Sequence, residues 1–167
     1  MKGNKMRSSS ALFTFSFCLL VSLAAAATSV KDCRTSIWNS KVGVPPLNIT
    51  LNGCDKYPCV FRRNSNITGE MDFMYDKDLR VLIPEVTANL LVLSFDLDIN
   101  QDDGCDTLSM NRCPIKANTR ARYQFSMYVK SWIPLVSANI WFKFKDEKGN
   151  ITICVEVPVE IVDNTVG

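Results

Sequence analysis

Apolar and polar side chains alternate along five stretches of the chain. A period of two puts every second side chain on one face of a β-strand, so that one face packs in a core and the other meets water. The predicted strands lie at residues 71–75, 91–97, 123–129, 140–144 and 151–161. No stretch shows a sustained helical stripe of apolar residues. The pattern therefore predicts an all-β fold.

Turn-forming residues separate these runs. They occur at Pro45-Pro46 and at residues 64–69, 102–104 and 146–150. The last of these turns joins two strongly alternating runs, which predicts a hairpin with one of the longer loops. Several short strands with regular turns, in a chain of this size, predict a single antiparallel β-sandwich.

The N-terminal segment has the pattern of a secretory signal peptide. Lys2, Lys5 and Arg7 precede an apolar run that extends to Ala27 and ends in four alanines. Small residues at this place are typical of signal-peptidase cleavage. The alternative is a retained membrane anchor, for which a run of about 17 residues is near the lower limit. We expect a signal peptide at residues 1–27 and one exported domain at residues 28–167.

The charges and the absence of histidine exclude several function classes. The chain carries 19 Lys and Arg against 17 Asp and Glu, and without its leader it is close to neutral. It therefore has no basic field that would attract nucleic acid. The lack of histidine removes the Ser-His-Asp and Cys-His nucleophilic systems. Glu156 and Glu160 could form a carboxylate pair, but they lie on the polar face of a predicted strand. We expect no enzyme activity.

Metal binding is also not expected. Residues 98–104 place oxygen-bearing side chains at positions one, three and five of a calcium loop. Position six, however, is Asp103 rather than glycine, and position twelve is Ser109 rather than glutamate. A zinc site is disfavoured because the chain lacks histidine and any Cys-x-x-Cys pair. No metal or other cofactor is predicted.

Six cysteines follow the leader, and in an exported chain they predict three disulfide bonds. Fifteen pairings exist in principle, and the sequence alone does not choose among them. Proximity favours Cys54–Cys59 and Cys105–Cys113, which would leave Cys33–Cys154 to join the two ends of the domain. Sequons at Asn48, Asn66 and Asn150 agree with export and are candidate N-glycosylation sites.

The apolar strand faces can be interpreted in two ways. They can fill the core of the sandwich, or the two sheets can separate and enclose a cavity for a water-insoluble ligand. Periodicity does not distinguish a filled core from an open one.

A series of short motifs resembles the lipid-recognition (ML) domain family, most closely its small soluble Niemann–Pick type C branch. The motifs are Lys31-Asp32-Cys33, Cys54-Asp55-Lys56-Tyr57-Pro58-Cys59, Asp103-Gly104-Cys105, Cys113-Pro114-Ile115, Trp141, and the closing run from Cys154 to Val162. They cover the chain from about Val30 to Val162. The chain departs from the family at Arg34, where glycine is usual, and at residues 88–95, where a glycine- and proline-rich stretch is replaced by longer apolar side chains.

The resemblance implies an immunoglobulin-like β-sandwich with these three disulfides and an apolar cavity between its sheets. In the sterol-binding branch the pocket is lined by an aromatic segment, which matches residues 93–97 here with Phe95 as the aromatic, and by a tyrosine, which matches Tyr123. We expect the lining to come from inward positions, namely Phe73, Leu93, Phe95, Tyr123, Phe125, Met127, Ile133, Ile140, Phe142, Val155 and Val157.

These features together predict a secreted, non-enzymatic carrier of a sterol, fatty acid or similar small lipid. The expected destination is extracellular fluid or the lysosomal lumen. The expected partners are the hydrophobic ligand and a transient membrane or receptor contact, with the protein itself a monomer and no nucleic acid bound. The apolar loop of Trp132, Ile133 and Pro134 is a candidate for the rim of the opening. The alternative is an extracellular recognition or immune-accessory protein that acts through a protein partner.

Overall fold

The computed structural model describes residues 31–35, 40–91 and 93–164, so the predicted signal peptide lies outside the described residues. Ten strands and one short 3₁₀ helix are found within these ranges. They are β1 (Lys31–Asp32), β2 (Asn48–Leu51), β3 (Cys59–Arg62), β4 (Ser65–Phe73), β5 (Ile83–Leu90), β6 (Leu93–Leu97), η1 (Gly104–Thr107), β7 (Leu108–Met110), β8 (Ala121–Val129), β9 (Ser137–Lys145) and β10 (Ile151–Val162).

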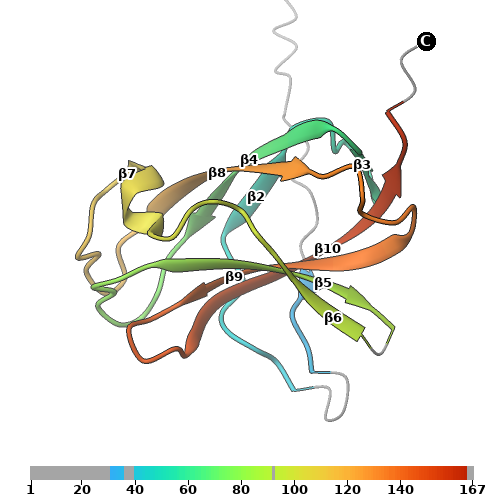
Figure 1. The fold of residues 1–167 in the computed structure, drawn as a ribbon. Helices are drawn as coiled ribbons and strands as arrows, with labels where there is room; N and C mark the ends of the chain where they lie inside the picture. Colours follow the sequence, from blue (N-terminus) through green and yellow to red (C-terminus); the bar gives the residue numbers. More distant parts are fainter. Residues whose placement is uncertain (1–30, 36–39, 92, 165–167) are drawn as a thin grey trace, which may run out of the picture.

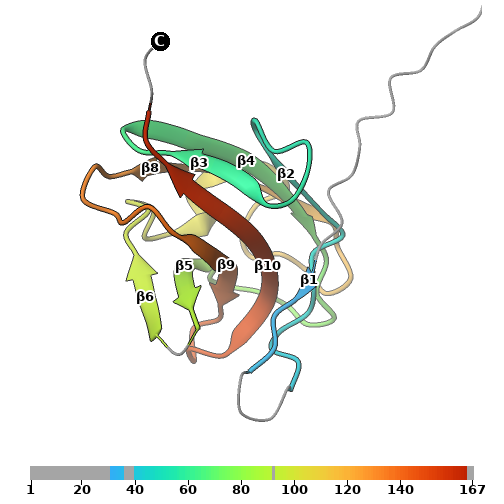
Figure 2. The same ribbon diagram turned by 90° about the vertical axis from the view of Figure 1, so that its right-hand side faces the viewer.

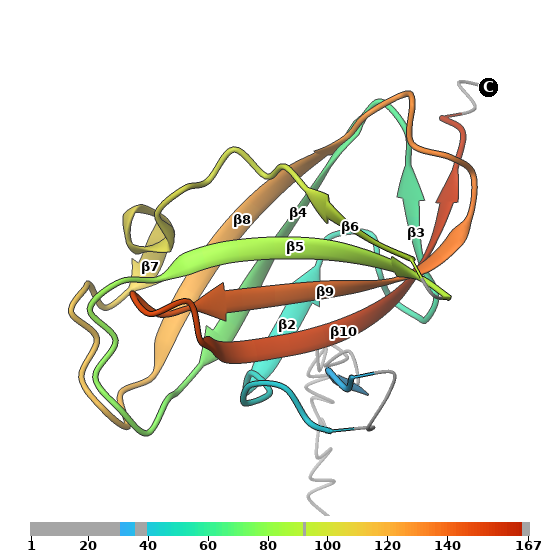
Figure 3. The ribbon, with the colours of Figure 1, turned by 60° about the horizontal axis from the view of Figure 1, so that its bottom comes forward.

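The strands form two sheets that pack face to face (Figure 1). The six-stranded sheet has the order β1-β10-β9-β5-β6, and β3 also pairs with β10. The four-stranded sheet has the order β2-β4-β8-β7. Figure 3 shows β5, β9 and β10 side by side in one layer, with β2, β4 and β8 in the other. The predicted all-β, immunoglobulin-like sandwich is confirmed, and the pairing is antiparallel except for β3, which runs parallel to β10.

Three details differ from the sequence prediction. The run 91–97 is not one strand, because Leu91 lies in the turn that follows β5, with a φ of 50° and a fully exposed side chain. β5 itself was not predicted. Tyr75 lies beyond the end of β4.

The alternation of β10 is interrupted by a bulge between Ile151 and Ile153. Thr152, which the alternation places on the solvent face, is buried there, and its hydroxyl donates a hydrogen bond to the Phe144 carbonyl oxygen at 3.1 Å. A bulge shifts which side chains face inward, and strict alternation does not reveal it.

The three disulfide bonds are Cys33–Cys154, Cys54–Cys59 and Cys105–Cys113, the pairing that proximity and the resemblance favoured. The first spans 121 residues and ties the N-terminal segment to β10. Cys154 alternates with the inward side chains Ile153 and Val155 and would be on the outer face of β10, yet both cysteines of this bond are buried. The segment that includes Gly43 and Val44 covers it, with Val44 exchanging backbone hydrogen bonds with Thr152 and Cys154.

Gly43 explains how that segment comes so close. It has a φ of +67°, and a Cβ at this position would lie 3.1 Å from the backbone nitrogen of Cys154. A larger residue would both strain the left-handed backbone and push the segment off β10.

Candidate functional site

The interior of the sandwich changes character from one end to the other. On β8 the inward side chains are Tyr123 and Phe125, followed by the smaller Met127 and Val129. The antiparallel β9 shows the same order in reverse, with Ala138 and Ile140 followed by Phe142 and Phe144. Since the two strands lie in facing sheets, their large side chains meet at one end and their small ones at the other. We call these ends the aromatic half (Phe73, Tyr123, Phe125, Phe142, Phe144) and the pocket half (Phe61, Ala88, Met127, Val129, Ile140, Ile161).

The aromatic half is closely packed. The ring of Phe144 lies 5.2 Å from that of Phe73 and 4.8 Å from that of Tyr123, edge to face in the second case. The rings of Phe125 and Phe142 lie 4.9 Å apart across the two sheets. The void that remains beside these rings measures only about 10 Å³. This end of the sandwich is a filled core, with ring geometries that are favourable for aromatic pairs.

The pocket half encloses an apolar pocket of about 140 Å³ between the sheets. Its walls come from β3, β5, β8, β9 and β10, and its opening from the end of β6 and the β8–β9 loop. The lining residues are Phe61, Ala88, Asp96, Leu97, Asp98, Met127, Tyr128, Val129, Lys130, Trp132, Ile133, Ile140 and Ile161. The polar members lie on the segments that surround the opening, so the pocket has an apolar interior and a polar rim.

An ion pair spans this rim. Lys130, which follows β8, lies 3.9 Å from the Asp98 carboxylate, which follows β6, and both side chains are substantially exposed. Trp132 lines the pocket and is 72% exposed. The opening therefore lies between the β8–β9 loop and the end of β6, and one loosely held ion pair connects its two sides.

The predicted lining residues fall into four groups. Met127, Ile133 and Ile140 line the pocket. Tyr123, Phe125 and Phe142 surround the 10 Å³ void of the aromatic half. Phe73, Val155 and Val157 are completely buried and line neither space. Leu93 and Phe95 are half exposed on β6 and line neither space.

The position of Phe95 has a simple geometric reason. Phe95 pairs with Ala88, which pairs with Ile140, so all three side chains point to the inner face of the sheet. β6 is the outermost strand, and there the inner face is not covered (Figure 2). The alternation of apolar residues identified the face on which Phe95 lies. Its exposure depends on the order of the strands in the sheet, which alternation does not reveal.

Tyr123, which was expected in the pocket lining, also lies outside the pocket. Its side chain is buried in the aromatic half, and its hydroxyl donates a hydrogen bond to the Gln101 side-chain oxygen at 2.8 Å. Burial raises the pKa of this hydroxyl well above its ordinary value. The group is a neutral, satisfied core hydroxyl that lies away from the pocket opening.

The pocket residues that sequence reasoning missed include Phe61, Ala88, Val129 and Ile161, whereas Leu97 falls in the segment that the resemblance indicated. The sequence does contain a signal for part of this set. Side chains shrink from Tyr123 to Val129 along β8 and grow from Ala138 to Phe144 along β9. When the inward side chains of two antiparallel strands become smaller toward the same end of the sandwich, space is left between the sheets at that end.

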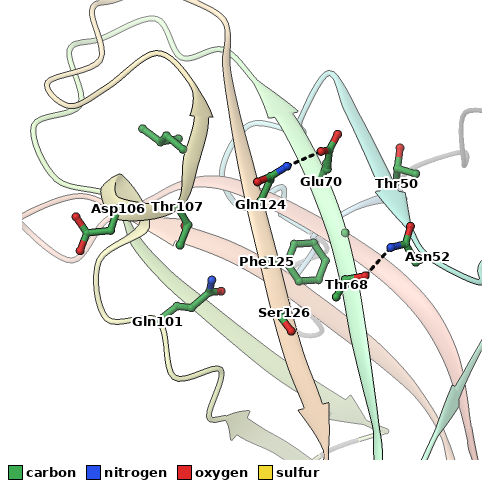
Figure 4. A pocket seen from close by; sticks show the side chains of 12 residues that line it. Thr50, Asn52, Thr68, Glu70, Gln101, Asp106, Thr107, Gln124, Phe125 and Ser126 are labelled. Carbon is green, nitrogen blue, oxygen red and sulfur yellow. Dashed lines mark hydrogen bonds between the residues drawn. The ribbon is translucent and has the colours of Figure 1, made fainter.

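A second depression, of about 680 Å³, lies at the outer face of the four-stranded sheet (Figure 4). Its lining is mainly neutral and polar, including Thr50, Thr68, Gln124 and Ser126, and Gln124 donates a hydrogen bond to Glu70 at 2.7 Å. It is larger than the inner pocket but open and hydrophilic. An apolar ligand would leave water less completely there, so the smaller pocket is the better candidate for such a ligand.

The outer face at the aromatic end carries a charged cluster. The Asp72 carboxylate is almost completely buried and accepts two hydrogen bonds from Arg122, at 2.6 and 2.9 Å, and one from Arg120. The hydrogen bonds from Arg122, and then those from Arg120, outweigh the opposing effect of burial and lower the pKa of Asp72 to about 2. This arrangement stabilises the sheet and has no open position for a substrate.

The described part of the chain shows neither a metal site nor a membrane-spanning helix. No group of three or more His, Cys, Asp or Glu side chains there could hold a metal ion. None of the helices described is long and apolar enough to cross a bilayer.

Comparison with known proteins shows to which family this chain belongs. Residues 27–161 match the family model of the ML domain. The chain belongs to the ML domain family. The "NPC intracellular cholesterol transporter 2 homolog a" of Drosophila melanogaster is 25% identical over 146 residues, which are 86% of this chain and 94% of that protein. The "NPC intracellular cholesterol transporter 2" of Mus musculus is 27% identical over 147 residues, which are 86% of this chain and 93% of that protein.

A solved structure gives the same result for the fold. The crystal structure of a Niemann-Pick type C2 protein from Japanese carpenter ant superposes with a TM-score of 0.68 at 25% identity, and covers 80% of this chain and 99% of that one. The ML family and its Niemann–Pick type C branch, which the sequence motifs indicated, are confirmed.

Proposed function

We propose that this chain is an exported, non-catalytic carrier that binds a sterol, fatty acid or similar small lipid between its two sheets. The observation that carries the proposal is the apolar pocket of about 140 Å³ in the pocket half, bounded by Ala88, Met127 and Ile140 and opening beside Trp132. The relatives named as cholesterol transporters support a ligand of this chemical class.

The pocket has to widen to hold a whole lipid. Pockets for small molecules usually measure about 300–1,000 Å³, which is more than the space described here. Three features allow the widening. The side chain of Met127 is unbranched and adaptable, the ion pair between the β8–β9 loop and the end of β6 is long and exposed, and Trp132 is largely exposed. In the proposed carrier, the loop moves outward as the ligand enters and the packed aromatic half keeps the two sheets joined.

The driving force is removal of apolar ligand surface from water. Several hundred square ångströms at about 25 cal/mol per Å² supply on the order of 10 kcal/mol. Association and ordering costs reduce this, which leaves micromolar to nanomolar affinity. No catalytic group is needed for binding and release of this kind.

The compartment and the contacts of the carrier follow from other features. Disulfide bonds persist in oxidising surroundings such as the extracellular fluid, and the lysosomal lumen is a second candidate destination. The exposed loop of Trp132, Ile133 and Pro134 beside the opening is suited to transient contact with a membrane or receptor, because tryptophan favours the membrane–water interface. Asn66 and Asn150 are exposed and Asn48 is half-buried, and glycosylation at these sequons remains a prediction.

A filling substitution tests the pocket directly. Ala88→Phe would place a ring in the pocket. We expect this variant to lose binding of a fluorescent fatty acid or sterol. Asn89→Phe adds the same ring on the other face of β5, and this control should bind normally. Equal binding by both folded variants would remove the pocket half as the ligand site. Native mass spectrometry of protein from its own source would identify the ligand carried.

A further inference from the structure

The edge strand β6 is open to pairing. It is the outermost strand of the six-stranded sheet and pairs only with β5 (Figure 2). Its side chains Leu93 and Phe95 are 57% and 50% exposed, and its sequence, Leu93-Ser94-Phe95-Asp96-Leu97, contains neither lysine nor proline. Proteins commonly protect edge strands with such residues because an unprotected edge recruits another strand.

The other edges in the described ranges are protected. β1 has two residues, and β7 has three with an irregular register. β2 has four residues, one of which is the sequon asparagine Asn48. β3 has four and ends in Arg62. A short strand gives few backbone bonds to a partner, and a charge or glycan obstructs its approach. β6, with five residues, is the longest of these edges. Its one charged side chain, Asp96, accepts a hydrogen bond from the Thr87 hydroxyl of β5 at 2.9 Å, which holds it toward the paired side of the strand.

The backbone of β6 has hydrogen-bonding groups available. Leu90 pairs with Leu93 at the end of the β5–β6 hairpin, so Leu93, Phe95 and Leu97 direct their N–H and C=O groups toward β5. The groups of Ser94 and Asp96 then point to the open side, where two residues offer two donors and two acceptors.

The strand is complementary to a second copy of itself. If two β6 strands run antiparallel with Phe95 opposite Phe95 of the partner copy, Ser94 faces Asp96 and Leu93 faces Leu97. Every pair is then apolar with apolar, or hydroxyl with carboxylate. A register centred on Asp96 would place two carboxylates opposite each other, which is unfavourable. Charge therefore favours the register centred on Phe95 over the one centred on Asp96.

We propose that two copies of this chain associate through β6, forming one continuous antiparallel sheet across a two-fold axis centred on Phe95. The two Phe95 rings would contact each other and lose their exposure to water, as cross-strand aromatic pairs do. The composition gave no reason to expect more than a monomer, and the open edge changes that expectation. The proposal does not depend on lipid carriage.

The small area of this contact indicates a weak dimer. Five residues from each copy form a small interface, below the roughly 1,200 Å² of stable complexes. We therefore expect a reversible dimer that dissociates on dilution. In this arrangement the hairpin tip of each copy lies beside the end of the partner copy's β6.

Sedimentation velocity over a range of concentrations tests the association. The wild-type chain should sediment increasingly as a dimer, and Phe95→Lys should raise the dimer dissociation constant by at least about tenfold. Leu47→Lys changes another exposed leucine, 54% accessible and away from β6, and should dimerise like the wild type. A wild type that remains monomeric at several hundred micromolar would overturn the proposal, as would equal behaviour of the two variants.

Cross-linking tests the register. Cysteines facing each other in a non-hydrogen-bonded antiparallel pair have Cα atoms about 4.5 Å apart, close enough for a disulfide. Phe95→Cys should form a covalent dimer on mild oxidation much faster than Leu91→Cys, a fully exposed position at the hairpin tip. Equal rates would indicate random collision and overturn the register. If the wild-type chain stays monomeric but sediments with phosphatidylcholine vesicles, the edge contacts lipid and self-pairing is excluded; ligand binding measured in the same samples reports separately on the proposed function.

Discussion

The aromatic half and the pocket half are built from the same two sheets, yet one is filled and the other is open. In the first, Phe73, Tyr123 and Phe144 form a continuous set of ring contacts. In the second, Ala88 and Ile140 leave room between β5, β9 and β8. The difference lies in side-chain size along each strand, because the backbone pairing continues through both halves.

This comparison separates two requirements of a binding protein. Close packing of large rings stabilises the fold, and a space for a guest molecule removes contacts that would otherwise stabilise it. Placing the two at opposite ends of one sandwich lets the pocket half change shape while the aromatic half remains closed. The charged groups differ in the same way. At the aromatic end the buried Asp72 carboxylate is held by two arginines, whereas the ion pair at the pocket opening is exposed on both sides.

The largest expected effect comes from deleting a ring in the aromatic half. Phe144→Ala removes a completely buried side chain that contacts two other rings, and should lower the free energy of unfolding by about 3–5 kcal/mol. Ile140→Ala should lower it by only about 2 kcal/mol, because its side chain already borders an open space. Denaturant unfolding followed by circular dichroism measures both values.

The substitutions Phe144→Ala and Ile140→Ala should also differ in their effect on ligand binding. Ile140→Ala enlarges the pocket, so larger lipids should bind it better than they bind the wild type. If the two substitutions were equally destabilising and ligand size preference did not change, the distinction between the two halves would be wrong.

The next effect concerns Asp72 and its pH dependence. Its pKa is about 2 in the folded chain against an ordinary value of 3.8. A carboxylate whose pKa is lowered by folding stabilises the fold above its unfolded pKa, and this contribution is lost as the pH falls toward the folded pKa. The shift corresponds to about 2 kcal/mol at most, and exposure of the Arg120 side chain reduces this to about 1–2 kcal/mol.

Asp72→Asn should therefore destabilise the chain by about 1–2 kcal/mol at neutral pH. The difference between variant and wild type should disappear between pH 4 and pH 2, the interval between the two pKa values. Thermal unfolding at a series of pH values measures it. A difference that stays constant down to pH 2 would show that Asp72 acts through packing and not through its charge.

The smallest effect on stability is expected at the pocket opening. Lys130→Ala breaks an exposed pair at 3.9 Å and should change the free energy of unfolding by less than about 0.5 kcal/mol. It should nevertheless speed ligand release, because the pair connects the two sides of the opening. Stopped-flow release of a fluorescent fatty acid tests this, with Lys130→Arg as the control that keeps the charge. Identical release rates in both variants would mean that the pair does not restrict the opening.

Much of the fold could be predicted because alternation and cysteine spacing are local signals. The apolar row of β10 and the tight pair Cys54–Cys59 are both visible in the sequence. Features that depend on strand order were not visible. Phe95 faces inward as its alternation indicates, but only the position of β6 at the edge shows that it is exposed. Thr152 is buried by a bulge that alternation does not reveal.

The candidate site was predicted less completely than the fold. Met127 and Ile140 were identified, since any inward residue of β8 or β9 was a candidate. Tyr123 was expected in the pocket lining but lies in the aromatic half, because the inward direction of a side chain does not say at which end of the strand it lies. Ala88 was missed because β5 was not recognised as a strand. Side-chain size compared across neighbouring strands is the information that distinguishes the two ends.

The place of β10 in the sheet has a consequence for biosynthesis. This strand is the last in the chain, and it pairs with β9, β3 and β1, so it holds together segments translated much earlier. A nascent polypeptide that has emerged only as far as Lys145 lacks the strand that joins them. The six-stranded sheet is therefore completed only after residues 151–162 leave the ribosome, and until then β3 and β9 lack the strand that pairs with both, which exposes their apolar faces to aggregation.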